Sequence, residues 1–317
     1  MRYLLAVCGI FAASMASAER LKIVTDIAPI HSIVSMIVEG VSPEPTMLDT
    51  ANDPHHLSMS PSEGRQLLAA DAVIWMGPEI TPALGRMIDQ LYIQENLSLL
   101  HIPNPPMLVH GNLVEFNFEW SAPTEFHSAD HLGDHSHGHT EGDDHAHDHG
   151  ALDPHAWLDP INGAFYAQSI AVFLGELNPD VADQYMANAM ALTERLEALS
   201  ARMKDTVSVQ RNTLLLPYHD AYRYFFARHD LRIRGSLSDT HAHAPSAARM
   251  SEIITQIDEQ KRNCLFLEPG ANESLITGLD PNIHASILDP LGALLRPSTG
   301  LYEFMLERIA QTIADCR

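Results

Sequence analysis

Residues 180–210 read DVADQYMANAMALTERLEALSARMKDTVSVQ, a run without proline or glycine. Because these two residues disfavour a helix interior most strongly, we expect one continuous helix here. A helix of about 30 residues is about 45 Å long, which is more than a single α/β unit requires. This helix therefore divides the chain into two parts.

Short apolar runs that resemble β-strands lie on both sides of the helix. They are Leu21–Thr25, Pro45–Leu48, Ala72–Met76, Leu97–Ile102, Thr213–Pro217, Leu231–Leu237, Cys264–Leu267 and Ala285–Leu288. Helical stretches lie between most of them, at Pro29–Glu39, Pro61–Leu68, Ala221–Arg228, Pro245–Arg262 and Gly300–Cys316. The second stretch begins with a capping box, Ser60-Pro61-Ser62-Glu63. Apolar strands that alternate with helices indicate parallel sheets covered on both faces. The sequence thus predicts an α/β fold with two lobes, each a roughly four-stranded, mostly parallel sheet flanked by helices, joined by a long rigid helix and separated by a cleft.

The first 18 residues have the pattern of an export signal. Arg2 is followed by an apolar stretch at residues 3–13, and Ala16-Ser17-Ala18 matches an A-x-A cleavage site. A lipoprotein signal at Cys8 is a weaker alternative, because Val7 stands where a small residue is usual. We expect a mature periplasmic chain with an N-terminal lobe over 19–179, a connecting helix over 180–210 and a C-terminal lobe over 211–317.

The charge balance excludes some partners. Without Arg2 the chain has 18 basic and 41 acidic side chains, a net charge of −23 with histidine neutral. So acidic a protein is not expected to bind nucleic acid, and it attracts cations. We expect it to be a monomer.

Two cysteines, Cys264 and Cys316, follow the signal segment. An even pair in an oxidising compartment favours one disulfide, although two separate buried thiols are the alternative.

A histidine-rich loop occupies residues 127–149, within a segment of about 125–151 that we expect to be disordered without metal. Its low content of apolar residues cannot form a core. Imidazoles mixed with carboxylates bind Zn²⁺ or Cu²⁺ without a fixed geometry, so we expect an accessory metal-binding segment. Its eight histidines are His127, His131, His135, His137, His139, His145, His147 and His149.

Four further positions are candidate metal ligands: His55, His155, His219 and Asp289. All except His155 lie in loops just after predicted strands, where open α/β sheets bind their ligands. A single loop histidine is more often a solvated surface residue, and Asp-Pro pairs often only begin turns. His56 competes with His55, and the spacing barely separates the two.

Several longer stretches resemble the zinc-binding solute receptors of bacterial ABC importers, the ZnuA-like group of the cluster A-I metal receptors. They are PHHLSMSPSE at 54–63, ADAVIWMGPE at 70–79, DPHAWLDP at 153–160, YHDAYRYF at 218–225, CLFLEP at 264–269 and LDPLG at 288–292. The resemblance covers most of the mature chain and includes the position of the histidine-rich loop. It implies a non-enzymatic receptor that binds Zn²⁺ between two lobes and delivers it to an inner-membrane ABC permease and its ATPase.

Carried over residue by residue, the resemblance implies that His55, His155 and His219 are the metal ligands. Histidine at the third position favours zinc, because manganese-binding relatives have glutamate there and imidazole suits zinc. Pro54 stands where some zinc receptors have a glutamate, which leaves Asp289 or water as the fourth ligand.

The resemblance also implies the disulfide between Cys264 and Cys316. Glu268, in the FLEP motif after a strand, is a candidate for the carboxylate that orients a ligating imidazole. A hydrogen bond to a nearby backbone N–H is the equal alternative for Glu268. The histidine-rich loop would then capture zinc for the cleft or sense a zinc-replete periplasm.

Overall fold

The computed structural model describes residues 20–48, 53–103, 153–231, 236–238, 251, 263–271 and 283–316. The predicted signal segment and the histidine-rich loop lie outside these residues, as does almost all of the helix predicted at Pro245–Arg262. Among the described helices, none combines the length and the hydropathy that crossing a membrane would require.

The first sheet is four-stranded and entirely parallel, as predicted. Its order is β2-β1-β3-β4. The strands are β1 (Ile23–Thr25), β2 (Thr46–Met47), β3 (Ala72–Trp75) and β4 (Asn96–Ser98). The prediction of a strand over Leu97–Ile102 was too long, because β4 ends at Ser98 and a 3₁₀ turn, η2 (Leu99–His101), follows it.

Three helices accompany this sheet: α1 (Ala28–Val38), α2 (Pro61–Leu68) and α3 (Pro82–Leu91). The capping box predicted at the start of α2 is present, since the Ser60 side chain accepts from the Glu63 N–H and the Glu63 carboxylate accepts from the Ser60 N–H. The sequence analysis missed α3.

The second sheet is also parallel, with the order β5-β6-β7. Its strands are β5 (Leu214–Pro217), β6 (Asn263–Leu267) and β7 (Ile283–Ile287). A fourth strand was predicted at Leu231–Leu237, of which 232–235 lie outside the described residues. Residues 236–238 run along the end of β5, where His219 and Ser238 form a parallel bridge.

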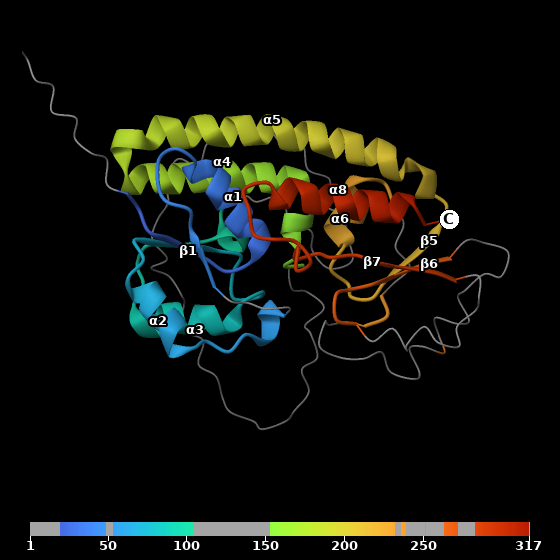
Figure 1. The fold of residues 1–317 in the computed structure, drawn as a ribbon, viewed down its shortest axis with the longest axis horizontal. Helices are drawn as coiled ribbons and strands as arrows, with labels where there is room; N and C mark the ends of the chain where they lie inside the picture. Colours follow the sequence, from blue (N-terminus) through green and yellow to red (C-terminus); the bar gives the residue numbers. More distant parts are fainter. Residues whose placement is uncertain are drawn as a thin grey trace, which may run out of the picture.

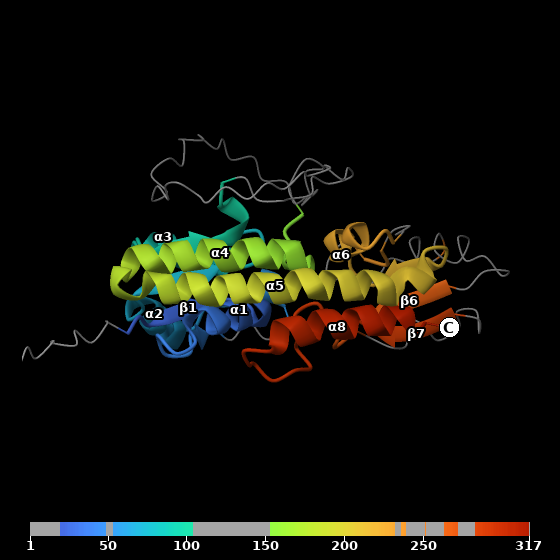
Figure 2. The same cartoon turned by 90° about the horizontal axis from the view of Figure 1, so that it is seen from above.

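A layer of long helices joins the two sheets (Figures 1 and 2). The layer consists of α4 (Pro160–Leu177), α5 (Ala182–Val207) and α8 (Leu301–Ala314), and α5 contacts α1 and α4 as well as α8. The predicted connecting helix is therefore α5, with the 3₁₀ turns η4 (Pro179–Val181) and η5 (Ser208–Gln210) at its ends.

One stripe of α5 is buried, and its members recur every three or four residues, as expected for a helix packed on one side. They are Tyr185, Ala189, Leu192, Leu196, Leu199, Met203 and Val207. By contrast, α4 is buried around most of its circumference. A helix that is apolar all round lacks the amphipathic period, which explains why the sequence analysis did not find α4.

The predicted disulfide is present. Cys264 in β6 bonds to Cys316, just after α8, with Cα atoms 6.0 Å apart. It ties the end of the last helix to the middle strand of the second sheet. Near the same point the Gln210 side chain donates to the carbonyls of Ala314 and Cys316.

Helices α4 and α8 approach closely at Gly163. A Cβ atom at this position would lie 2.7 Å from Cε1 of Tyr302, which is fully buried. The Tyr302 hydroxyl donates to the carbonyl of Trp157 at 2.6 Å, so the ring cannot move away without losing a buried hydrogen bond.

We expect Gly163→Ala to destabilise the fold by about 1–3 kcal/mol, because it overpacks the core against Tyr302. Urea denaturation measures the change. Gly64→Ala in α2 is the matched control, since its Cβ would meet no atom closer than Met87 Sδ at 4.0 Å and helix propensity favours alanine. Equal effects of the two substitutions would contradict this packing argument.

Candidate metal centre

The tripeptide Asp-Pro-His occurs twice and folds the same way both times. In each copy the aspartate side chain accepts from the backbone N–H of the histidine, from His55 to Asp53 at 3.1 Å and from His155 to Asp153 at 3.0 Å. Each turn fixes the backbone from which an imidazole projects. The two copies differ in what their imidazoles contact.

His55 lies in the 3₁₀ turn η1 (Pro54–His56). Its Nδ1 is 3.1 Å from the carbonyl oxygen of Glu79, in the turn between β3 and α3. Because a carbonyl can only accept, Nδ1 carries the proton and Nε2 carries the lone pair. This is the tautomer in which Nε2 can ligate a metal.

His155 is buried beside its own aspartate. Its Nδ1 is 2.9 Å from Oδ1 of Asp153, which is itself buried. The Tyr224 hydroxyl donates to the Asp153 carbonyl at 3.0 Å and so fixes this segment from the C-terminal part of the chain. A carboxylate on Nδ1 orients an imidazole and makes Nε2 a better ligand.

His219 follows β5 and is also buried. Its Nδ1 lies 3.9 Å from Oε1 of Glu268, which follows β6 and is buried as well. The predicted association of Glu268 with an imidazole is therefore compatible with the structure, in an ion-pair geometry longer than a hydrogen bond. The charges of Glu268 and Asp289 add to burial, the largest cause, in raising the pKa of Tyr222 far above its ordinary value.

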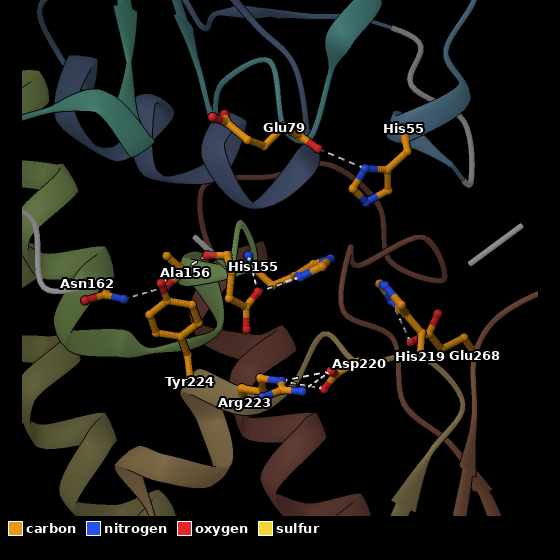
Figure 3. A network of polar contacts seen from close by, with 11 residues as sticks. His55, Glu79, His155, Ala156, Asn162, His219, Asp220, Arg223, Tyr224 and Glu268 are labelled. Carbon is orange, nitrogen blue, oxygen red and sulfur yellow. Dashed lines mark hydrogen bonds and ion pairs between the residues drawn. The ribbon is translucent and has the colours of Figure 1, made fainter. Parts of the chain in front are cut away.

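The three imidazoles face one another (Figure 3). Their ring centroids are 4.8 Å apart for His155 and His219, 5.8 Å for His55 and His155, and 6.4 Å for His55 and His219. Two imidazoles on one tetrahedral zinc ion, with bonds of about 2.0–2.1 Å, have centroids about 5 Å apart. The observed triangle is therefore close to that of a three-histidine site and slightly wider on the side of His55.

Among the residues that the structure describes, no group of three or more histidine, cysteine, aspartate or glutamate side chains is arranged to hold a metal ion as it stands. The two longer separations both involve His55. A shift of this ring by about 1 Å toward the other two would bring the spacing to that of a zinc site.

The other candidates have different contacts. His56 is largely exposed and its Nδ1 pairs with Asp53 at 2.8 Å. Asp289 follows β7, and its two carboxylate oxygens accept from the backbone N–H groups of Ala293 and Leu294 at 2.9 and 2.8 Å. The eight histidines of residues 127–149 lie outside the described residues.

An ion pair with a buried carboxylate holds the segment that carries His155 against the segment that follows His219. Arg228, at the end of α6 (Arg223–Arg228), donates to both carboxylate oxygens of Asp159 at 2.9 and 2.6 Å. Asp159 also accepts from the Ile161 N–H and so begins α4. His155 and His219 are thereby fixed relative to each other, and the hydrogen bonds described above for His55 are to Asp53 and Glu79.

Asp26, at the end of β1, supports the turn that positions His55. The side chain is fully buried, and it accepts from the N–H of Ile27 at 2.8 Å and of Met76 at 2.9 Å, and from the Thr81 hydroxyl at 3.2 Å. Met76 and Thr81 flank the turn that contains Glu79. Burial raises the pKa of Asp26 to about 6, although these hydrogen bonds lower it.

Three groups that position the histidines were not predicted from the sequence: the Asp153 carboxylate, the Glu79 carbonyl and the Asp26 carboxylate. Asp153 was not among the predicted site residues, yet its carboxylate orients His155. The carbonyl of Glu79 has no side-chain signature. The repeat of Asp-Pro-His was the available signal for Asp153, whereas the burial of Asp26 had none.

The sequence matches the family described as "Zinc-uptake complex component A periplasmic" (ZnuA) over residues 23–316. The chain belongs to this family. A high-affinity zinc uptake system protein ZnuA from Paracoccus denitrificans is 35% identical over 309 residues, covering 96% of this chain and 94% of the relative.

Two solved structures share the fold of this ZnuA family member. A crystal structure of ZnuA superposes with a TM-score of 0.69 at 20% identity, covering 94% of this chain and 99% of the other. The solute-binding protein FpvC of Pseudomonas aeruginosa in complex with Mn²⁺ gives a TM-score of 0.72 at 20% identity, covering 94% and 98%. The predicted α/β fold with a long connecting helix is thereby confirmed.

We expect Asp26 to make stability depend on pH. Between about pH 4 and 6 the folded protein binds a proton at Asp26 that the unfolded chain has lost, so stability falls as pH rises through this window. At about 1.4 kcal/mol per pKa unit, the loss is of the order of 3 kcal/mol by pH 7.

Urea denaturation of the metal-free protein and of Asp26→Asn, from pH 4 to 7, measures this effect. The stability of the variant should rise relative to the parent as pH increases, because asparagine has no charge to bury. Parallel profiles for the two proteins would show that Asp26 is not the titrating group.

Proposed function

We propose that this protein is a periplasmic zinc receptor, without enzymatic activity, that binds Zn²⁺ through His55, His155 and His219. The observation that carries the proposal is the common orientation of the three imidazoles. Each Nδ1 faces an oxygen acceptor, from Glu79, Asp153 or Glu268, and the rings lie within 6.4 Å of one another. Three imidazoles in the Nδ1–H tautomer form a donor set that suits zinc.

The ligand chemistry favours zinc over manganese. Manganese prefers sites richer in carboxylate oxygens, whereas this set is dominated by nitrogen. Water or Asp289 would complete the tetrahedron. Water has the stronger support, because each oxygen of Asp289 already accepts from a backbone N–H.

Capture of zinc would draw His55 toward a pair that is already in place. His155 and His219 have the shortest ring separation, 4.8 Å, and the ion pair of Asp159 with Arg228 links their segments. His55 has the longer separations of 5.8 and 6.4 Å. Binding and release then depend on a small movement of the η1 turn.

The family supports the remaining parts of the proposal. We propose that a signal peptide over residues 1–18 exports the chain, and that the monomeric receptor, with lobes over 19–179 and 211–317, delivers zinc to an ABC permease and its ATPase. The histidine-rich loop over 127–149 would capture or sense additional zinc.

We expect His155→Ala and His219→Ala each to weaken zinc binding by roughly 100-fold or more, because each removes one of three nitrogen ligands. Competition with a chromophoric zinc chelator measures the affinity. His56→Ala is the matched control and should stay within roughly threefold of the parent, since this exposed neighbour pairs with Asp53 instead. Unchanged affinity in both ligand variants would overturn the assignment of the site.

We also expect deletion of residues 127–149 to leave one tight zinc equivalent and to remove several weaker ones. A flexible segment loses chain entropy when it binds, so its affinity falls below that of a preorganised site. Titration calorimetry of the two proteins separates the equivalents. Loss of the tight equivalent on deletion would place the principal site in the loop instead.

A further inference from the structure

A second histidine–carboxylate pair lies close to the turn that positions His55. Nε2 of His101, the last residue of η2, is 3.1 Å from Oε1 of Glu79. The two residues follow β4 and β3, which are neighbours in the first sheet. We call Glu79 and His101 the outer pair.

The His101 ring is fixed from both sides. Its Nδ1 is 2.7 Å from the Ser98 hydroxyl, and Ser98 Oγ is also 3.4 Å from the carbonyl of Met76. When the hydroxyl donates to Met76, Nδ1–H donates to the hydroxyl and the Nε2 lone pair faces the Glu79 carboxylate. In the other tautomer the Ser98 hydroxyl donates to Nδ1 and Nε2–H donates to the Glu79 carboxylate, and a metal ion can take the place of that proton.

The spacing of the outer pair suits a metal ion as well as a proton. Two ligands of a tetrahedral zinc ion, with bonds of about 2.0–2.1 Å, are about 3.3 Å apart. The separation of 3.1 Å is close to this value. The side chains of His101 and Glu79 are 50% and 36% exposed, so water can supply the remaining ligands.

Gly77 provides the space for this arrangement. Its φ is +141°, and a Cβ atom there would lie 2.9 Å from Glu79 Oε2 and 3.0 Å from Ser98 Oγ. Any other residue at this position would push the carboxylate and the hydroxyl aside. The backbone is therefore shaped around the outer pair.

Electrostatics agree with a tightly coupled pair. The hydrogen bond to Glu79 raises the pKa of His101, against the effect of partial burial. Partial burial alone would raise the pKa of Glu79, but the hydrogen bond from His101 and the residue's own N–H bring it below the ordinary value. The pair thus attracts positive charge at the point between its two side chains.

We propose that the outer pair is a second, weaker site for a zinc-like divalent cation. The proposal rests on the proposed function and deepens it. Glu79 links the two sites. Its carbonyl is 3.1 Å from Nδ1 of His55, and its carboxylate lies on the other side of the residue (Figure 3). That carboxylate belongs to the outer pair. A cation at the outer pair would therefore be bound by the residue whose carbonyl positions His55.

The background protein is the full-length chain with the eight histidines of the loop replaced by asparagine. His241 and His243, which form a short H-x-H sequence, are replaced in the same way. The test is a zinc titration of this protein. This background removes other weak sites. We expect one tight and one weaker zinc equivalent. His101→Asn should retain the tight equivalent and raise the Kd of the weaker one at least tenfold, and Glu79→Gln should raise that Kd similarly.

His56→Asn is the matched control, because it removes a histidine–carboxylate pair on the other side of His55 and should leave the weaker equivalent unchanged. As an independent readout, the ¹⁵N shift of His101 Nε2 should move on zinc addition to the value of a metal-bound nitrogen.

Two outcomes would overturn the outer site and leave the receptor proposal intact. One is a tight zinc equivalent without a weaker one, and the other is a weaker equivalent that neither variant affects. In either case the outer pair is an ion pair only. Loss of the tight equivalent from the background protein would instead contradict the three-histidine centre.

Discussion

The ion pair of the buried Asp159 carboxylate with Arg228 is the constraint on which the proposed metal centre depends. It joins the start of α4, four residues after His155, to the end of α6, nine residues after His219. The guanidinium of Arg228 donates to both carboxylate oxygens of Asp159, and the Asp159 side of the pair is buried. The two imidazoles that lie closest together are thus fixed by a contact outside the site itself.

This arrangement gives the three proposed ligands unequal roles. His155 and His219 face carboxylates, from Asp153 and Glu268, whereas His55 faces a neutral backbone carbonyl. A carboxylate on Nδ1 increases the basicity of Nε2 more than a carbonyl does. The pair linked by the ion pair therefore supplies the stronger electron donors, and His55, which has the longer ring separations, supplies the weaker one. Such a division suits a carrier that must both hold its cargo and release it.

The sequence predicted the parts of this structure that depend on local chemistry. The helix over 180–210 follows from the absence of proline and glycine, and the α2 cap from Ser60 and Glu63. The three imidazoles were named from their motifs, and the structure brings them together. The sequence could not show α4, because burial on all sides removes its periodic pattern. Nor could it show the role of the Glu79 carbonyl, because backbone groups leave no mark in a sequence.

The buried stripe of α5 has one more consequence, which concerns sliding motions. Its members from Tyr185 to Met203 alternate between steps of four and three residues, close to a heptad repeat. Side chains packed in this register slip past a neighbouring helix in steps of about one turn, roughly 5.4 Å along the axis. Smaller displacements would lift each side chain out of its hole along the entire contact. The helical layer therefore does not permit small sliding motions. When a metal ion is exchanged, we expect the short turns that hold the proposed ligands to move instead.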